Sequence, residues 1–219
     1  MIRGAALFDL DGVLINTYPQ ALKSIPIVAK KMKIRVPTEE EIRFHWGLGP
    51  YHYVEKFWPG LLLEVYESAY EECGFKNKTV PPIDGAIEVL DFFHRQHYYI
   101  GLITNRDRHS LERRIRLAGI PVDYFDYIQP IENATAPKPD PRVFDYVLHL
   151  IRNQEINGGP IFYVGDTPTD FYATRETGIQ FIGVLTGPTS REKFLEIGVQ
   201  EKNIIPSIKN LPAFWDSKD

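Results

Sequence analysis

Five short apolar runs, rich in β-branched and aromatic residues, alternate with patterns of helical period along this chain of 219 residues. Each run is bounded by glycine, proline or polar residues, as buried strands are. The runs span residues 4–10, 98–103, 124–128, 161–164 and 180–185. Strands that alternate with helices are joined by right-handed crossovers, which makes the sheet mostly parallel. The sequence therefore predicts an α/β fold with a Rossmann-like, doubly wound sheet.

Helical patterns fill the intervals between these runs. Apolar residues recur three to four positions apart in residues 86–95 and 110–118, and the second pattern ends at Gly119. A third pattern, residues 142–151, follows Asp140 and a proline, which are the residue types preferred at a helix N-cap and first turn. These three segments are predicted to be the crossover helices of the sheet.

Residues 16–82 interrupt the alternation of strands and helices. Their patterns are helical, and Thr38 with Glu41 has the spacing of a capping box. A segment of this length cannot be an ordinary loop between a strand and a helix, because such loops have about 2 to 6 residues. We expect these residues to form a helical cap domain inserted after the first strand, with two of its helices at residues 19–32 and 61–73. The α/β core is then formed by residues 1–15 and 83–219.

Charge and cysteine content restrict the classes of partner and compartment. The chain has 25 basic and 29 acidic residues, a formal net charge of −4, which offers no attraction to nucleic acid or to an anionic membrane. The single cysteine, Cys73, cannot form an intrachain disulfide, and no run of 18 apolar residues or signal-peptide pattern is present. We expect a cytoplasmic protein, monomeric or homodimeric.

Polar residues that follow the apolar runs are expected to meet at one edge of the sheet, because open α/β sheets bind ligands outside the carboxyl ends of their strands. Several carboxylates beside one lysine would repel each other in a dry cleft unless a hard cation lay among them. Mg²⁺, which prefers oxygen ligands, is the predicted cofactor. The residues are Asp9, Asp11, Thr104, Asn105, Lys138, Asp166 and Asp170.

These residues lie in four motifs, and in them the chain resembles the haloacid dehalogenase superfamily, specifically its phosphatase branch with a helical cap, broadly similar to phosphoglycolate phosphatases. The resemblance covers nearly the whole chain. One departure is Asn16, at a position where related chains often carry an acid. The motifs are Phe8-Asp9-Leu10-Asp11-Gly12-Val13-Leu14, Ile103-Thr104-Asn105, Lys138-Pro139 and Gly165-Asp166-Thr167-Pro168-Thr169-Asp170.

The resemblance implies a role for each motif residue. Asp9 is the expected nucleophile, which forms an aspartyl-phosphate, and Asp11 the expected acid and base. Asp9, Asp11 and Asp166 are the implied metal ligands, with Asp170 as a water-mediated or outer partner of the ion. Thr104, the amide of Asn105 and Lys138 are the implied phosphate-binding groups. Structural alternatives remain open: Thr104 as a helix N-cap, and Asp170 as an acid that stabilises a helix dipole.

Three other features have weaker functional interpretations. Arg106 and Arg108 can reach a substrate carboxylate, but a solvated helix face is favoured. The loop Gly47-Leu48-Gly49 either contributes to substrate choice or is an ordinary turn. Four aromatic residues of the insert are expected in the core of the cap, and the alternative is that one of them lines the pocket: Tyr51, Tyr53, Phe57 and Trp58.

The predicted function is a Mg²⁺-dependent phosphatase that acts on a small phosphorylated metabolite, similar to phosphoglycolate. A mutase similar to β-phosphoglucomutase would share all four motifs. A dehalogenase is disfavoured, because halide displacement needs no acid such as Asp11. A non-catalytic binding protein on the same scaffold is disfavoured by the complete set of motif residues, and zero turnover on a broad panel of phosphates would revive it.

Overall fold

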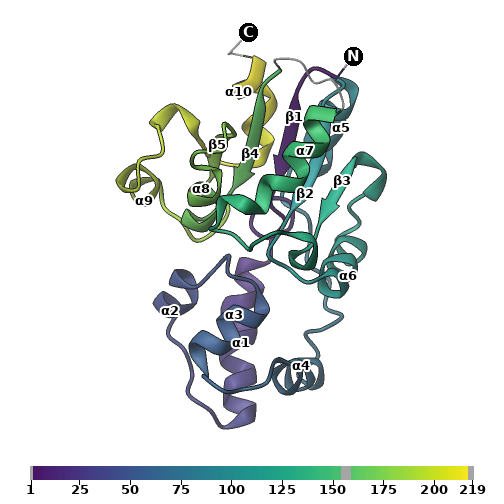
Figure 1. Ribbon diagram of the computed structural model, residues 1–219. Helices are drawn as coiled ribbons and strands as arrows, with labels where there is room; N and C mark the ends of the chain where they lie inside the picture. Colours follow the sequence, from purple (N-terminus) through teal and green to yellow (C-terminus); the bar gives the residue numbers. More distant parts are fainter. Residues whose placement is uncertain (1, 154–158, 217–219) are drawn as a thin grey trace.

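The computed structural model describes residues 2–153 and 159–216. Its sheet has six strands in the order β3-β2-β1-β4-β5-β6, and every pair of neighbours is parallel. This is the strand order of a doubly wound nucleotide-binding fold, so the predicted fold class is confirmed. The strands, drawn as arrows in Figure 1, are β1 Ala5–Phe8, β2 Tyr99–Ile103, β3 Tyr127–Gln129, β4 Ile161–Gly165, β5 Gln180–Val184 and β6 Ile204–Ile205.

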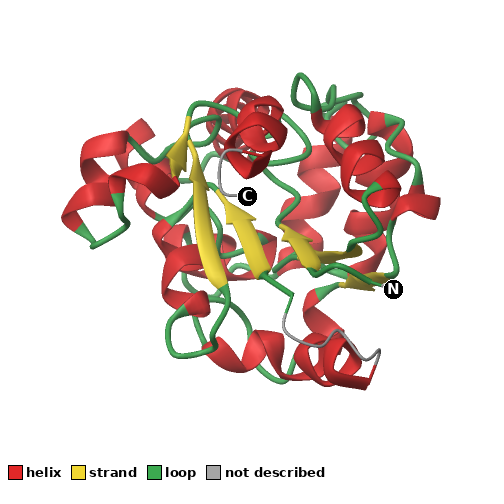
Figure 2. Cartoon of the chain, turned by 90° about the horizontal axis from the view of Figure 1, so that it is seen from above, coloured by secondary structure: helices red, strands yellow, loops and turns green. Residues whose placement is uncertain are grey.

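Helices cover both faces of the sheet, as Figure 2 shows. On one face, Ala6 and Phe8 of β1 pack in one apolar cluster with helices α5 (Ala86–Arg95), α6 (Arg108–Ala118) and α10 (Leu211–Asp216). On the other face, Ala5 and Leu7 pack with α7 (Asp145–Asn153), α8 (Pro168–Thr174) and α9 (Arg191–Glu196). Successive side chains of a strand point to opposite faces, and all four residues of β1 are fully buried, so this strand lies at the centre of the core.

Most predicted core elements are observed, with shifted ends. The helix expected at residues 110–118 begins at Arg108, because the Asp107 carboxylate accepts a hydrogen bond from Ser110 N and caps the first turn. The pattern at residues 142–151 begins as a 3₁₀ turn, Pro141–Phe144, before α7. Strand β6 was not expected, since two residues give no detectable period.

Residues 16–82 contain the helices α1 (Tyr18–Met32), α2 (Glu39–Phe44), α3 (Pro50–Phe57) and α4 (Leu63–Glu72). They form a separate body below the sheet in Figure 1 and pack around an apolar cluster of their own that includes Phe57 and Trp58, with Tyr53 packed against it. The predicted capping box at Thr38 and Glu41 is present. We call residues 16–82 the helical insert.

The helical insert is joined to the core by two chain segments that lie side by side. Asn16 N donates a hydrogen bond to Pro81 O at 3.0 Å, and Ile83 N donates one to Leu14 O at 2.9 Å. Ile15 and Pro82 form an antiparallel bridge between these bonds. No helix of the described residues is long and apolar enough to cross a membrane.

Candidate active site

Three predicted site residues follow neighbouring strands at the same level. Asp9 follows β1, Thr104 follows β2, and Asp166 follows β4. Phe8, the last residue of β1, pairs with Leu102 on one side and with Val164 on the other. The carboxyl ends of three parallel strands therefore meet at one edge, and the three polar side chains are buried there.

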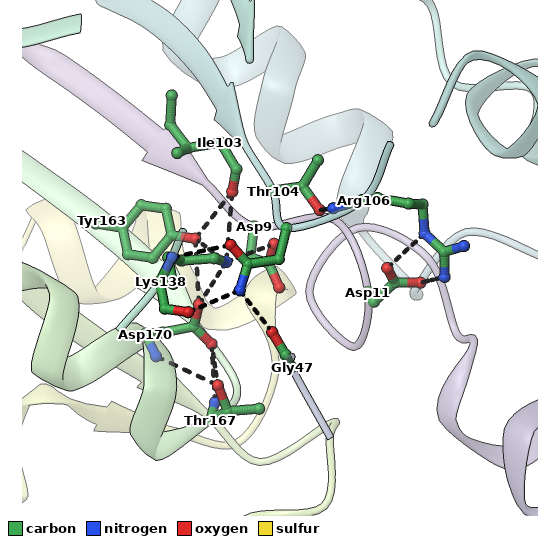
Figure 3. A network of polar contacts seen from close by, with 11 residues as sticks. Asp9, Asp11, Gly47, Ile103, Thr104, Arg106, Lys138, Tyr163, Thr167 and Asp170 are labelled. Atoms are coloured by element: carbon green, nitrogen blue, oxygen red, sulfur yellow. Dashed lines mark hydrogen bonds and ion pairs between the residues drawn. The ribbon is translucent and has the colours of Figure 1, made fainter. Parts of the chain in front are cut away.

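Lys138 is the centre of the buried polar network in Figure 3. Its ammonium group lies 2.9 Å from Asp9 Oδ1 and 2.7 Å from Asp170 Oδ1, and it donates to the Tyr163 hydroxyl at 2.7 Å. Burial alone would lower the pKa of Lys138, but the two carboxylates raise it above its ordinary value. Lys138 is thus a permanent cation held against the nucleophile predicted from the sequence.

Asp170 lies in the first turn of α8, and both of its carboxylate oxygens have partners. Oδ1 accepts from Lys138 and Tyr163, and Oδ2 accepts from the backbone N–H and hydroxyl of Thr167. Thr167 caps the helix in return, through its hydroxyl. The structural alternative considered for Asp170 is therefore present as a capping box, and the same side chain also orients Lys138.

Asp166 differs from Asp170, because neither of its carboxylate oxygens has a hydrogen-bond partner in the described part of the chain. The residue is fully buried, and burial together with the charges of Asp170 and Asp9 raises its pKa well above the ordinary value. A methyl group built on Gly12 or on Gly187 would overlap this carboxylate. Two glycine backbones thus leave room for a carboxylate that the protein itself does not neutralise.

A divalent cation fits these carboxylates. Single oxygens of Asp9, Asp166 and Asp170 all lie within 4.8 Å of one another. Three carboxylates face one ammonium group, so an added positive charge would balance the site, and an all-oxygen donor set suits Mg²⁺ or Ca²⁺. The partners of Asp170 are already in place, which leaves Asp9 and Asp166 as the oxygen donors. Asp11, which was also predicted as a ligand, lies outside this group of three.

The pKa of Asp9 gives a prediction for the protein in chelator. Burial, with the charges of Asp170 and Asp11, raises this pKa from 3.8 to about 7, against the opposing effect of Lys138. The unfolded chain releases the proton near 3.8, so from there to about pH 7 the folded state binds more protons, and its stability falls as the pH rises. The wild type should therefore lose stability relative to Asp9→Asn between about pH 4 and pH 7, by at most about 4 kcal/mol.

Urea denaturation of both proteins in chelator at about pH 5 and about pH 7.5 measures this difference. Comparing the two variants cancels the titration of every group other than Asp9 and the groups coupled to it. A difference in unfolding free energy that is the same at both values of pH would contradict the raised pKa.

Asp11 is held by Arg106, in a second cluster that Figure 3 shows apart from Lys138. Arg106 Nε donates to Asp11 Oδ2 and Nη2 to Asp11 Oδ1, both at 2.8 Å. The favoured interpretation of Arg106 as part of a solvated helix face is wrong, because its side chain is only 12% exposed. Burial alone would raise the pKa of Asp11, but the guanidinium lowers it below the ordinary value. In this arrangement, with no metal ion beside Asp9, Asp11 is ionised and Asp9 is the carboxyl more inclined to hold a proton.

Thr104 and Asn105 connect the edge of the sheet with the start of the next loop, with Lys138 and with the helical insert. The Thr104 hydroxyl accepts a hydrogen bond from Arg106 N at 3.2 Å. The Asn105 side-chain amide donates to Gly47 O of the helical insert at 2.9 Å and to Lys138 O at 3.0 Å, and its oxygen accepts from Lys138 N at 2.9 Å. Asn105 therefore fixes the backbone of Lys138 and contacts the insert with the same side chain.

A cavity of about 500 Å³ lies between the sheet edge and the helical insert. Asp9, Asp11, Thr104 and Lys138 line it from the core, and the insert contributes apolar and aromatic side chains that include Trp46, Tyr53 and Phe57. It has a polar end and an apolar wall, as sites for small molecules do. Gly47 and Gly49 of the predicted loop also line it, whereas Leu48 does not.

A doubly wound sheet with Asp9, Lys138 and Asp166 buried at its carboxyl edge, facing a helical insert, is the arrangement expected of an α/β enzyme with its site at that edge. The family model of the haloacid dehalogenase-like hydrolases matches residues 6–184, which is most of the chain. The chain belongs to this family, as the four motifs indicated.

Relatives with assigned names agree with this membership. The chain is 31% identical over 185 residues to a Clostridium perfringens protein provisionally named pyrophosphatase PpaX, covering 82% of this chain and 83% of that one. It is 25% identical over 217 residues to the phosphoglycolate phosphatase of Nitrosospira multiformis, covering 93% and 92%. The fold is shared with a crystal structure from Thermotoga maritima, provisionally described as a β-phosphoglucomutase, with a TM-score of 0.71, 22% identity and coverage of 98% and 99%.

Proposed function

We propose that this protein is a Mg²⁺-dependent phosphatase that hydrolyses a small phosphorylated metabolite through an aspartyl-phosphate at Asp9. The observation that carries the proposal is the position of Asp9. It lies at the polar end of the cavity, paired with Lys138, and next to an unpartnered buried carboxylate. The names of the two relatives, a pyrophosphatase and a phosphoglycolate phosphatase, support phosphate esters and anhydrides as substrates.

In the first step, one Asp9 oxygen attacks the phosphorus, and the bond from phosphorus to the leaving oxygen breaks as the new bond forms. Lys138 and the Thr104 hydroxyl are placed to contact the non-bridging oxygens, on which negative charge gathers. In the second step, water attacks the acyl phosphate and restores Asp9. The cavity walls supplied by the helical insert, which we propose acts as a cap, exclude other water from the first step.

Asp9 and Asp166 would hold the magnesium ion. When bound, the ion keeps Asp9 ionised and screens the charge of the phosphoryl group from that of the carboxylates. Asp170 supports this arrangement from outside, through Lys138. The same screening would reverse the raised pKa of Asp9, because an adjacent cation favours the ionised form.

We propose Asp11 as the group that protonates the leaving oxygen and then removes a proton from water. To do so it must leave Arg106 and take up a proton from solvent as the substrate enters, because the ion pair holds it deprotonated. Asp11→Asn should therefore lower kcat about 10²-fold or more on an alkyl phosphate, and less than about tenfold on a nitrophenyl phosphate, whose leaving group needs no proton. Equal losses on both substrates would remove Asp11 from the acid role.

The test of the function is a screen of phosphorylated metabolites, phosphoglycolate and pyrophosphate among them, with Mg²⁺ added, replaced by Ca²⁺, or removed by chelator. Release of free phosphate that requires Mg²⁺ and is absent from Asp9→Asn supports the proposal. Calcium should support less turnover, since its looser coordination suits in-line transfer badly. Full activity in chelator would contradict the metal requirement.

The same screen separates the rival functions. A β-phosphoglucomutase-like mutase would convert one sugar phosphate to another without releasing phosphate, and the Thermotoga maritima fold likeness is compatible with either outcome. Binding without turnover of any compound would favour a non-catalytic protein. We propose a reducing, cytoplasmic location, with the Cys73 thiol free, and a monomer or homodimer.

A further inference from the structure

A second cavity lies beside the first, between core helix α6 and helices α1 and α4 of the insert. Arg106, Trp46, Tyr53 and Ile25 line both cavities, so the two share a wall. The proposed phosphatase mechanism uses nothing on the far side of that wall. The residues found there include two arginines from successive positions of α6, Arg113 and Arg114.

The second cavity carries an excess of positive charge. Its charged lining residues are Arg106, Arg113, Arg114 and Glu67. Arg106 is already neutralised by Asp11, and Glu67 lies at the exposed surface of α4. One carboxylate therefore faces two guanidinium groups, and burial together with the neighbouring arginines lowers the pKa of Arg113. Such an excess is costly where a guanidinium is removed from water, as that of Arg114 is, unless an anion compensates it.

The two arginines also have unused donors. Arg114 is more than nine-tenths buried, and its terminal nitrogens donate to Tyr70 OH at 3.0 Å and to Lys78 O at 3.4 Å. Its Nε, like that of Arg113, is buried without a hydrogen-bond partner in the described ranges of the chain. Buried donors of this kind are rare in folded proteins, and guanidinium groups pair with the oxygens of phosphate or carboxylate.

We infer that this second cavity is an oxyanion site, which binds a phosphate or carboxylate group through Arg113 and Arg114. Because the same four residues line both cavities, the two are adjacent, and one inferred occupant is a molecule that reaches both, with its scissile phosphate at Asp9 and a second anionic group between α6 and α4. The anion in the second cavity has two possible sources. The first is the substrate itself, and this choice rests on the proposed function. The second is a free inorganic anion, and the oxyanion chemistry of the site is the same for both.

Arg113→Gln tests the site with little risk to the fold, because Arg113 is only half-buried and donates no side-chain hydrogen bond among the described residues. Arg116→Gln is the matched control, since Arg116 lies about one turn of α6 beyond Arg113, is exposed and does not line the cavity. Arg113→Lys retains the charge and should keep part of the effect. None of these residues contacts the predicted catalytic groups.

The first arm compares butyl phosphate with butane-1,4-diol bisphosphate as substrates. If the substrate supplies the anion, kcat/KM should favour the bisphosphate by about tenfold or more in the wild type and in Arg116→Gln. In Arg113→Gln most of this preference should be lost while turnover of butyl phosphate stays unchanged. If a free anion is the occupant, added sulfate should instead change the KM for a nitrophenyl phosphate, and this change should reach a plateau as the site fills. The change should be seen in the wild type and in Arg116→Gln and should be lost in Arg113→Gln.

The second arm measures sulfate binding by calorimetry and needs no turnover. The wild type and Arg116→Gln should bind two sulfate ions, one in each cavity, whichever source supplies the anion in the cell. Arg113→Gln should bind one, because the sulfate ion in the second cavity is lost. Equal stoichiometry in all three proteins, with no effect of Arg113→Gln in the first arm, would overturn the inference. Absence of phosphatase activity with two sulfate sites would contradict the proposed function and leave the oxyanion site standing.

Discussion

Asp9→Asn should lower kcat roughly 10⁴-fold or more on every substrate, while the protein stays folded. The amide has the shape of the carboxylate but cannot attack phosphorus, and among the residues that the structure describes no other carboxylate both borders the cavity and pairs with Lys138. Removal of one negative charge from a group of three should also raise stability in chelator, because one ammonium group then faces fewer carboxylates. Steady-state kinetics and thermal denaturation of the same preparation measure the two effects together.

Isotope labelling tests the intermediate directly. A thiophosphate analogue of the substrate, made chiral with two oxygen isotopes and hydrolysed in water of the third, should give thiophosphate of retained configuration, because attack by Asp9 and then by water each inverts the configuration at phosphorus. The configuration of the released thiophosphate therefore reports whether one displacement or two occurred. Inverted configuration would mean that water attacks the substrate directly and that Asp9 has another role.

Lys138→Met should reduce the free energy of unfolding by about 3–5 kcal/mol in chelator and remove activity. The methionine fills the space of the lysine stem, but it leaves Asp9, Asp166 and Asp170 without a cation in a buried site. Lys209→Met is the control. Lys209 pairs with Asp84 at the surface, where solvent already screens the charges, so the stability should change little.

A double variant separates loss of charge balance from loss of packing. Asp170→Asn removes one of the carboxylates that Lys138 neutralises, so Lys138→Met with Asp170→Asn should recover part of the stability lost in Lys138→Met. Added Mg²⁺ should also narrow the gap between Lys138→Met and the wild type. If the double variant is as unstable as the sum of the single variants, the lysine acts through packing, and the electrostatic account of the site is wrong.

The fold could be predicted from the sequence where burial is continuous. β1, β2 and β4 are covered on both faces, so they are unbroken apolar runs, and their positions in the chain are evident. Elements at the margin were harder to predict. β3 was expected at residues 124–128 and is observed at Tyr127–Gln129, because Tyr124 ends a 3₁₀ turn and its apolar side chain alone does not distinguish a turn from a strand. β6 depends on pairing with β5, which no local pattern encodes.

The candidate site shows the same division. Residues that directly follow strands were identified, because the sheet fixes where they lie. Arg106 was misjudged, because its acidic neighbours in sequence, Asp107 and Glu112, suggested a solvated helix, whereas its partner Asp11 is 95 residues away. Tyr163 was missed because it lies within a buried strand, where a tyrosine looks like core. Its hydroxyl reaches Lys138 only once β4 and the loop before α7 are assembled.

The paired connections between the insert and the core have a mechanical consequence. Two separate tethers would let the insert both tilt and twist, but the segments at Asn16 and Pro81 are hydrogen bonded into one narrow ribbon. Bending of this ribbon leaves the hydrogen bonds from Asn16 to Pro81 and from Ile83 to Leu14 in place, whereas torsion would misalign both of them. The insert is therefore expected to rotate about a single hinge axis. Each closure then returns Trp46 and Gly47 to the same position above Asp9.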